Sequence, residues 1–239
     1  MIALLCSVQA EAERILGAMV VMRSTTLGSK LLIEGNLDDR RILLCISGMG
    51  KVNAAHAATL IFSQFNPEAI VVFGIGGAYA SSGARIGDLA IAKEEIAGDE
   101  GVLTQEGFKD AEYIGIPLLK TSTSVIYSTY TASEPLVKES LRSLMAYQEA
   151  VHVGSFVTLS TCTGTTARAR ELEERYHGLC ENMEGAAVAQ IAVLHGVPWL
   201  EVRGISNIVE QRDLATWDIP KATQSVQQAI IRIVAGWKP

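Results

Sequence analysis

The stretch Met183–Asn207 reads MEGAAVAQIAVLHGVPWLEVRGISN and indicates the class of fold. Its first half, 183–195, is apolar and rich in small residues, and it stops at the Gly-Val-Pro of 196–198, where glycine and proline end helices. Its second half, 199–206, is a short apolar run of the kind that forms a buried strand. A helix followed at once by such a strand is typical of a sheet covered by helices.

The same alternation runs along the rest of the chain and predicts an α/β fold with a largely parallel sheet. Buried strands are predicted at Ile2–Val8, Arg41–Ser47, Ala69–Ile75, Asp88–Ala92, Val151–Ser160 and Trp199–Ser206. Helices are predicted at Gln9–Met19, Lys51–Phe65, Glu134–Ala146, Thr165–His177, Met183–His195 and Pro220–Ala235. No repeat or linker divides 1–239, so a single domain is expected. The weakly periodic, Thr- and Ser-rich segment 98–133 is interpreted as a long excursion or a lid.

The composition excludes several classes of protein. A chain of 239 residues that is 49% hydrophobic and 19% charged is expected to fold around a sizeable core, and its net charge of −6 argues against a nucleic-acid surface. No apolar run approaches the roughly 18 residues of a membrane helix. The N-terminus has no basic lead, so a cytoplasmic protein is expected. The four cysteines are far apart and are expected to be reduced thiols, and no histidine has metal-ligand spacing.

Two glycine-rich turns are predicted to follow strands. One reads SGMGKV at 47–52, and the other reads GIGGA at 74–78. Such turns bring backbone N–H groups close to a ligand, although a tight structural turn would use the same residues. Neither has the spacing of a P-loop and neither completes Gly-x-Gly-x-x-Gly, so a dinucleotide-binding module is a poor fit.

Charged residues stand in or beside these apolar segments. Glu181 is interpreted as an N-terminal cap of the helix that follows, whereas Glu184, followed by small residues, is expected to be buried and to need a partner. Arg203 lies inside a buried strand and must be paired, with Glu184 or Glu11 as candidates, and the pair could be purely structural. Glu11 itself could be a solvated residue of a first helical turn. Asn207 ends its strand, at the side of the sheet where α/β proteins bind ligands.

Taken together, these segments resemble the purine nucleoside phosphorylase/nucleosidase superfamily over nearly the whole chain. The resemblance rests on Glu11 and on SGMGKV at 47–52, GIGG at 74–77, GDL at 87–89, NMEGAA at 182–187 and VRGISN at 202–207. It implies the nucleoside phosphorylase fold, a three-layer αβα sandwich around a twisted, mixed, largely parallel sheet. It also implies cleavage of the N-glycosidic bond of a small purine nucleoside, without a metal or an organic cofactor.

Two departures from the family's pattern narrow the reaction. Phosphorylases carry a phosphate-binding Gly-Asp-Pro-x-Arg segment soon after the first strand, whereas 7–11 reads SVQAE here, with an acid that would repel phosphate. Adenine-releasing nucleosidases end the later strand in Ile-Ser-Asp, whereas 205–207 reads Ile-Ser-Asn. The segment GVPWLEVRGISN resembles futalosine hydrolases, which release hypoxanthine from futalosine in menaquinone biosynthesis. A methylthioadenosine/S-adenosylhomocysteine or aminodeoxyfutalosine nucleosidase is the alternative, and a non-catalytic nucleoside-binding protein is the alternative of another class.

The resemblance implies a role for each candidate residue. Glu11 would activate the attacking water, Glu184 would bind the ribose, and Asn207 would bind the purine. A carboxamide can donate to O6 of hypoxanthine and accept from N7–H, whereas a carboxylate could only accept. The other substrate-binding candidates are Ile75, Gly76, Met183, Arg203, Ser206 and Arg212, the last being preferred over Arg85 and Lys51 as the partner of a carboxylate on the 5′ group. A homodimer or higher homo-oligomer is expected, with a neighbouring subunit closing the 5′ pocket.

Overall fold

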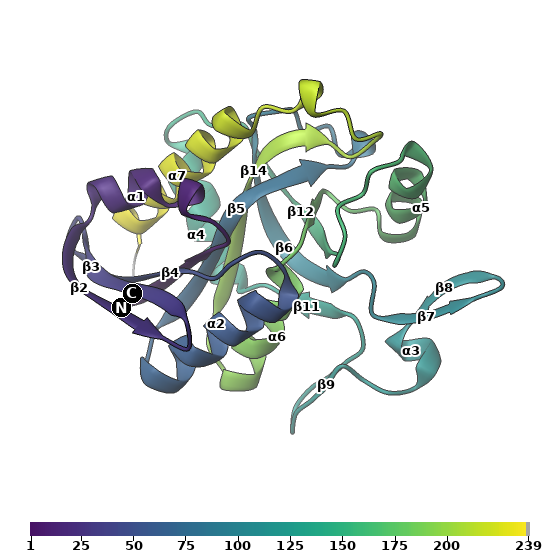
Figure 1. The fold of residues 1–239 in the computed structure, drawn as a ribbon, viewed down its shortest axis with the longest axis horizontal. Helices are drawn as coiled ribbons and strands as arrows, with labels where there is room; N and C mark the ends of the chain where they lie inside the picture. The colour runs from purple at the N-terminus through teal and green to yellow at the C-terminus, as the bar shows by residue number, and fades with distance from the viewer. Residues whose placement is uncertain (238–239) are drawn as a thin grey trace.

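The computed structural model describes residues 1–237, and its core is a ten-stranded sheet (Figure 1). The strands of this sheet are β1 (Ile2–Cys6), β2 (Val20–Leu27), β3 (Lys30–Leu37), β4 (Arg40–Ile46), β5 (Ala69–Ala78), β6 (Leu89–Ala97), β11 (Thr129–Thr131), β12 (Val151–Thr158), β13 (Cys180–Asn182) and β14 (Trp199–Ile208). The sheet is mixed, as predicted, but only five of its ten strand pairs are parallel, so it is not largely parallel.

Part of the sheet closes on itself, which corrects the prediction of a simple sandwich. β14 pairs with both β5 and β6, β6 pairs with β12, β12 pairs with β13, and β13 pairs with β5. These five strands form a ring, and β1, β4, β3 and β2 extend from β5 as an open wing. The register shifts between Gly154 and Ser155 in β12 and between Ile205 and Asn207 in β14. Such bulges bend a strand, which allows a sheet to curl.

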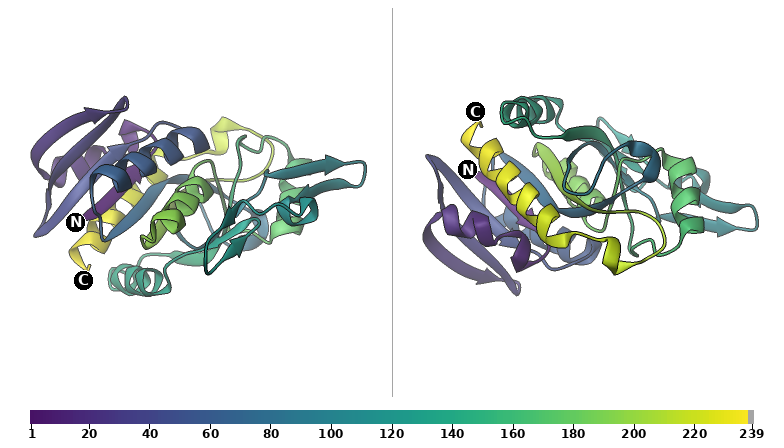
Figure 2. Two further views of the ribbon diagram at one scale, coloured as in Figure 1. Left: turned by 90° about the horizontal axis from the view of Figure 1, so that it is seen from below. Right: turned by 90° about the horizontal axis from the view of Figure 1, so that it is seen from above.

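Helices cover both faces of the wing and the adjoining ring (Figures 1 and 2). The helices on one face are α1 (Glu13–Ala18), α4 (Glu134–Met145) and α7 (Ile219–Ala235), those on the other are α2 (Lys51–Gln64) and α6 (Gly185–His195), and α5 (Thr166–Tyr176) covers the far end of the ring. In β1, Ala3 and Leu5 belong to the core under α2 and α6, whereas Leu4 belongs to the core under α7. Burial on both faces explains why β1 is a continuous apolar run. Within residues 1–237, no helix is long and apolar enough to cross a membrane.

The predicted elements are all present, but some of their ends differ, most of all at β6, which was predicted at Asp88–Ala92 and runs to Ala97. The predicted helix 9–19 is split into a 3₁₀ turn, Gln9–Glu11, and α1. The strand predicted to end at Ile75 continues to Ala78, so the residues 74–78 are strand and not a turn. The hairpin of β2 and β3 was not predicted, because β2 is largely exposed and lacks an apolar alternation.

The segment 98–133 is an excursion, as predicted. Its elements are the hairpin β7 (Gly101–Thr104) and β8 (Gly107–Asp110), the short helix α3 (Ala111–Ile114), the pair β9 (Leu119–Lys120) and β10 (Val125–Ile126), and β11. The β7–β8 hairpin projects away from the sheet, and β11 returns to pair with β6 (Figure 1). None of these residues lines the cavity at the ends of β1, β5 and β14.

Candidate active site

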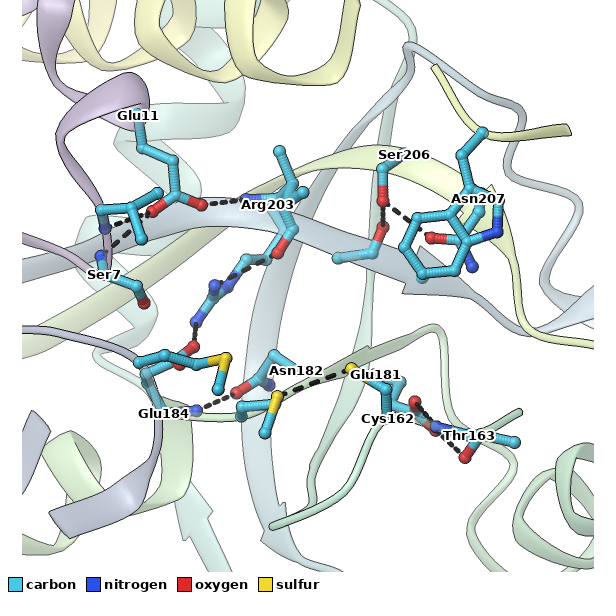
Figure 3. Close-up of a pocket in the computed structure, with 17 residues that line it drawn as sticks. Ser7, Glu11, Cys162, Thr163, Glu181, Asn182, Glu184, Arg203, Ser206 and Asn207 are labelled. Atoms are coloured by element: carbon cyan, nitrogen blue, oxygen red, sulfur yellow. Dashed lines mark hydrogen bonds and ion pairs between the residues drawn. The ribbon is translucent and has the colours of Figure 1, made fainter. Parts of the chain in front are cut away.

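A cavity opens where β1, β5 and β14 end, and side chains from β13 and the start of α6 face it (Figure 3). It is lined by eight of the nine site residues predicted from the sequence, namely Glu11, Ile75, Gly76, Met183, Glu184, Arg203, Ser206 and Asn207. The lining residues that were not predicted as site residues include Val8, Met49, Cys162, Thr163, Glu181 and Trp217. Residues far apart in the sequence therefore converge on one cavity.

Glu11 is held by backbone donors at one end of this cavity. Its Oε2 accepts hydrogen bonds from the backbone N–H of Ser7 at 3.0 Å and of Val8 at 3.2 Å, and its Oε1 accepts from Ile75 N–H at 2.9 Å. The side chain is 4% exposed, which excludes a solvated first-turn residue. Burial raises the pKa of Glu11, and the Arg203 charge and the three backbone donors partly oppose this rise. Glu11 is thus a fixed carboxylate whose pKa lies above that of an ordinary glutamate.

Gly74 lets Glu11 and Arg203 approach each other across β5. A Cβ at position 74 would lie 2.5 Å from Glu11 Oε1 and 2.9 Å from Arg203 Nη1, so no larger residue fits. The glycines of 74–77 therefore serve close approach within a strand rather than the turn that we predicted.

Glu184 stands at the N-cap position of α6, and its side chain joins two parts of the site. Its Oε1 accepts from Gly50 N–H at 2.9 Å, and its Oε2 lies 3.3 Å from Arg203 Nη2. Gly50 has a φ of 92°, a left-handed conformation that favours glycine, so the predicted glycine-rich turn is confirmed at this position. That turn presents a backbone donor to the carboxylate.

Arg203 is buried and has two carboxylate partners. The predicted partner Glu184 is confirmed, and Glu201, which was not predicted, accepts from Arg203 Nε at 2.8 Å. Burial alone would lower the pKa of Arg203, but the charges of Glu201, Glu184 and Glu11 raise it, so the guanidinium stays charged. Glu11, the other predicted partner, raises the pKa of Arg203 through its negative charge.

A second pair of carboxyl groups lies behind Arg203. Glu95 and Glu201 are both fully buried, and a Cβ at Gly185 would collide with an oxygen of each. Two buried carboxyl groups this close cannot both ionise. Burial, together with the Glu201 charge, raises the pKa of Glu95 well above its ordinary value. This rise favours the protonated form of Glu95, whereas Glu201 is the member of the pair that contacts Arg203.

Asn182, and not Glu181, caps the amide groups at the start of α6. Its Oδ1 accepts from Glu184 N–H at 2.9 Å and from Gly185 N–H at 2.7 Å, while its Nδ2 donates to Glu95 at 2.7 Å. The Glu181 oxygens accept from Thr163 and Tyr79 and not from the N–H groups of α6, so its interpretation as a cap was wrong. The asparagine holds the helix N-terminus and thereby places Glu184 at the cavity.

Glu181 also faces the cavity. Its oxygens accept from Thr163 N–H at 2.8 Å, from Thr163 Oγ1 at 2.5 Å and from the Tyr79 hydroxyl at 3.4 Å. Burial raises the pKa of Glu181, and the hydrogen bonds from Thr163 and Tyr79 partly oppose this.

The bulge in β14 places Ser206 and Asn207 at the other end of the cavity from Glu11 (Figure 3). Ser206 Oγ donates to Asn207 Oδ1 at 2.7 Å, and Asn207 Nδ2 donates to the carbonyl of Ile208 at 3.0 Å. One N–H of the carboxamide and part of the accepting capacity of its oxygen remain for a ligand.

Arg212, the ninth predicted site residue, does not line the cavity. Its guanidinium lies 5.0 Å from the ring centroid of Trp217, which does line it. Lys51, one of the other candidate cations, is ion-paired with Asp99 at 2.6 Å and with Glu100 at 2.9 Å. Within residues 1–237, no group of three or more His, Cys, Asp or Glu residues is placed to hold a metal ion.

Comparisons with known proteins identify the family of this chain. The family described as the phosphorylase superfamily matches residues 1–236. Futalosine hydrolase of Streptomyces coelicolor is 37% identical over 174 residues, which cover 71% of this chain and 68% of that protein. The 5′-methylthioadenosine/S-adenosylhomocysteine nucleosidase of Mycobacterium tuberculosis is 27% identical over 218 residues, which cover 87% of this chain and 85% of that protein.

The fold matches as well. The crystal structure of the Neisseria meningitidis 5′-methylthioadenosine/S-adenosylhomocysteine nucleosidase, in complex with methylthio-immucillin-A, has a TM-score of 0.86 at 22% identity and covers 99% of both chains. The chain therefore belongs to the phosphorylase superfamily, among its nucleosidase enzymes.

Proposed function

We propose that the protein hydrolyses the N-glycosidic bond of futalosine to hypoxanthine and dehypoxanthinyl futalosine. The observation that carries this proposal is the placement of a fixed carboxylate, Glu11, and a carboxamide, Asn207, at opposite ends of one cavity. The similarity to a relative named futalosine hydrolase supports the same substrate. Water would be the nucleophile, because the Glu11 carboxylate stands where a phosphate would be repelled.

The reaction builds positive charge on the ribose and negative charge on the purine, as in other glycosidic cleavages. Glu11 would take a proton from the attacking water, and its three backbone hydrogen bonds hold the carboxylate in place for that transfer. Glu184 would bind the ribose hydroxyls and stabilise the positive charge, with Met183 against the sugar. Arg203 would offset the repulsion between the carboxylates around it, and Ser206 would orient Asn207.

Asn207 would bind the edge of the departing purine. Its free N–H would donate to O6, and its Oδ1 would accept from N7–H as the base leaves. Ile75 and Gly76 would form the wall beside the base. The cation that meets the carboxylate of the 5′ group would be Arg212, whose guanidinium lies 5.0 Å from the ring centroid of the cavity-lining Trp217.

A homo-oligomer is part of the proposal. The excursion 98–133 exposes several large apolar side chains, among them Leu103, Tyr113, Ile116 and Val125. An apolar surface of this kind often marks an interface. A neighbouring subunit would cover it and close the 5′ side of the pocket.

A methylthioadenosine/S-adenosylhomocysteine nucleosidase is the second candidate. Relatives with that name also match, and a solved structure with that name shares the fold over 99% of both chains. The two candidates differ in the base that they release, so the products of the reaction distinguish them.

We expect base release from futalosine that needs neither phosphate nor a metal ion. The assay measures free hypoxanthine or adenine from futalosine, aminodeoxyfutalosine, methylthioadenosine and inosine, each with and without phosphate. A rate that rises with phosphate and yields ribose 1-phosphate from inosine would contradict hydrolysis. Preferred release of adenine would support the second candidate, and tight binding without release would support a nucleoside-binding protein.

We expect Asn207→Asp to lower the preference for the 6-oxopurine. A carboxylate oxygen would face O6, so two acceptors would oppose each other, whereas the 6-amino group would gain an acceptor. The ratio of kcat/KM for futalosine over aminodeoxyfutalosine should fall by at least about tenfold. These two substrates share their 5′ group, so the ratio isolates the base. If both efficiencies fall together and the ratio stays constant, Asn207 does not read the base.

A further inference from the structure

Glu181 is a buried carboxylate that the proposed reaction leaves without a role. It lines the same cavity as Asn207 and is 8% exposed. All three of its hydrogen bonds come from neutral donors on Thr163 and Tyr79. Arg168, the cation that acts on its pKa, is ion-paired with Glu171 instead. A buried carboxylate without a cation is costly, and its remaining lone pairs are free to accept from a ligand.

The sheet places Glu181 and Asn207 on either side of Gly77. Gly77 of β5 is paired with Glu181 of β13 on one side and with Asn207 of β14 on the other. Neighbouring strands lie about 4.8 Å apart, so the two backbones are separated by about 10 Å. Gly77 has no side chain, and a Cβ there would lie 3.1 Å from Asn207 Nδ2. Gly77, Glu181 and Asn207 all line the cavity, so the two side chains border the same space. Figure 3 draws the side chains of Glu181 and Asn207 at the end of the cavity away from Glu11.

The edge of a 6-oxopurine presents three groups in a row, N7, the acceptor O6 and the donor N1–H. A 6-aminopurine presents N7, a donor amino group and the acceptor N1. Asn207 can serve N7 and O6, which leaves N1–H in need of an acceptor. A carboxylate accepts only, and the two hydrogen bonds from Thr163 keep the Glu181 oxygens in the accepting role.

We propose that Glu181 accepts the N1–H of a 6-oxopurine and, together with Asn207, selects it over a 6-aminopurine. This inference rests on the proposed function and names a second residue that recognises the base. With a 6-aminopurine, the N1 lone pair would face a carboxylate oxygen, which leaves two acceptors opposed. The competing explanation is that Glu181 only anchors the loop at Thr163, and that role would affect both kinds of base alike.

The variants Glu181→Gln and Tyr79→Phe form a matched pair for the test. Glu181→Gln keeps the size of the side chain, removes its charge and introduces a donor. Tyr79→Phe removes a hydrogen bond to the same carboxylate from a side chain that does not line the cavity, and leaves the acceptor in place. The ratio of kcat/KM for futalosine over aminodeoxyfutalosine should fall at least about tenfold in Glu181→Gln and stay constant in Tyr79→Phe. A constant ratio in a folded Glu181→Gln would overturn the inference.

Binding of free bases gives a second readout that needs no turnover. Because Trp217 lines the cavity, the tryptophan fluorescence of the protein can report the dissociation constants of hypoxanthine and 1-methylhypoxanthine. The wild type should bind the N1-methylated base at least about tenfold more weakly, because the N1–H donor is lost. In Glu181→Gln this difference should shrink. Equal binding of the two bases by the wild type would overturn the inference even if Glu181→Gln does not fold.

The outcomes also separate this inference from the proposed function. A wild type that releases hypoxanthine from futalosine, with a ratio that Glu181→Gln does not change, would retain the proposed function and reject the role of Glu181. A wild type that prefers aminodeoxyfutalosine would reject both.

Discussion

Glu11→Gln is expected to lower kcat for base release by about 10²–10⁴-fold, the usual contribution of a general base. The carboxylate is held by three backbone N–H groups, so it is fixed in one orientation before substrate arrives. An amide of the same size cannot take a proton from water. It would also turn an NH₂ group toward one of the three donors, so the variant's thermal unfolding should be compared with that of the wild type.

The neighbouring acid provides a matched control for this variant. Glu13 is exposed at the start of α1, only two residues along the chain, and Glu13→Gln should keep near-normal turnover. Burial raises the pKa of Glu11, and a general base must be deprotonated. The kcat/KM of the wild type should therefore fall as the pH is lowered through that raised pKa, and the Glu11→Gln variant should lack this limb. Near-normal turnover of folded Glu11→Gln would remove Glu11 from the mechanism.

The parts of this molecule that the sequence predicts are those decided by local pattern and by the cost of buried charge. The continuous apolar sequence of β1 predicts a buried strand, and the structure covers both of its faces. Arg203 sits in an apolar strand, so a carboxylate partner had to exist, and Glu184 was named correctly. Asn207 ends a strand of an α/β sheet, where ligands meet such sheets, and it does line the cavity.

The parts that the sequence does not predict depend on pairing between distant segments. Glu181 precedes a helix and reads as a cap, but β13 is only three residues long and its place is set by pairing with β5 and β12. Glu95 follows Lys93 and Glu94 in the sequence, yet it is fully buried against Glu201. The ring of strands likewise requires β14 to reach both β5 and β6, and no local pattern encodes that contact.

Glu184→Gln is expected to lower kcat by about 10²–10³-fold, the range for removing one group that stabilises charge in a transition state. The carboxylate at the start of α6 would face the ribose, where positive charge develops as the bond breaks. The glutamine side chain of the variant would keep the contact with Gly50 N–H through its oxygen, so the loop 47–52 should stay in place. The loss should therefore appear mainly in kcat.

Glu201→Gln is the control that separates this effect from a disturbance of Arg203. Both carboxylates are ion-paired with Arg203, but only Glu184 lines the cavity. If Glu184 acts on the ribose, Glu201→Gln should cost far less turnover than Glu184→Gln. A substrate without the 2′-hydroxyl extends the comparison, because the penalty of Glu184→Gln should shrink when the hydroxyl that it binds is missing. Equal losses in the two variants, unchanged by the 2′-deoxy substrate, would mean that Glu184 acts only by positioning Arg203.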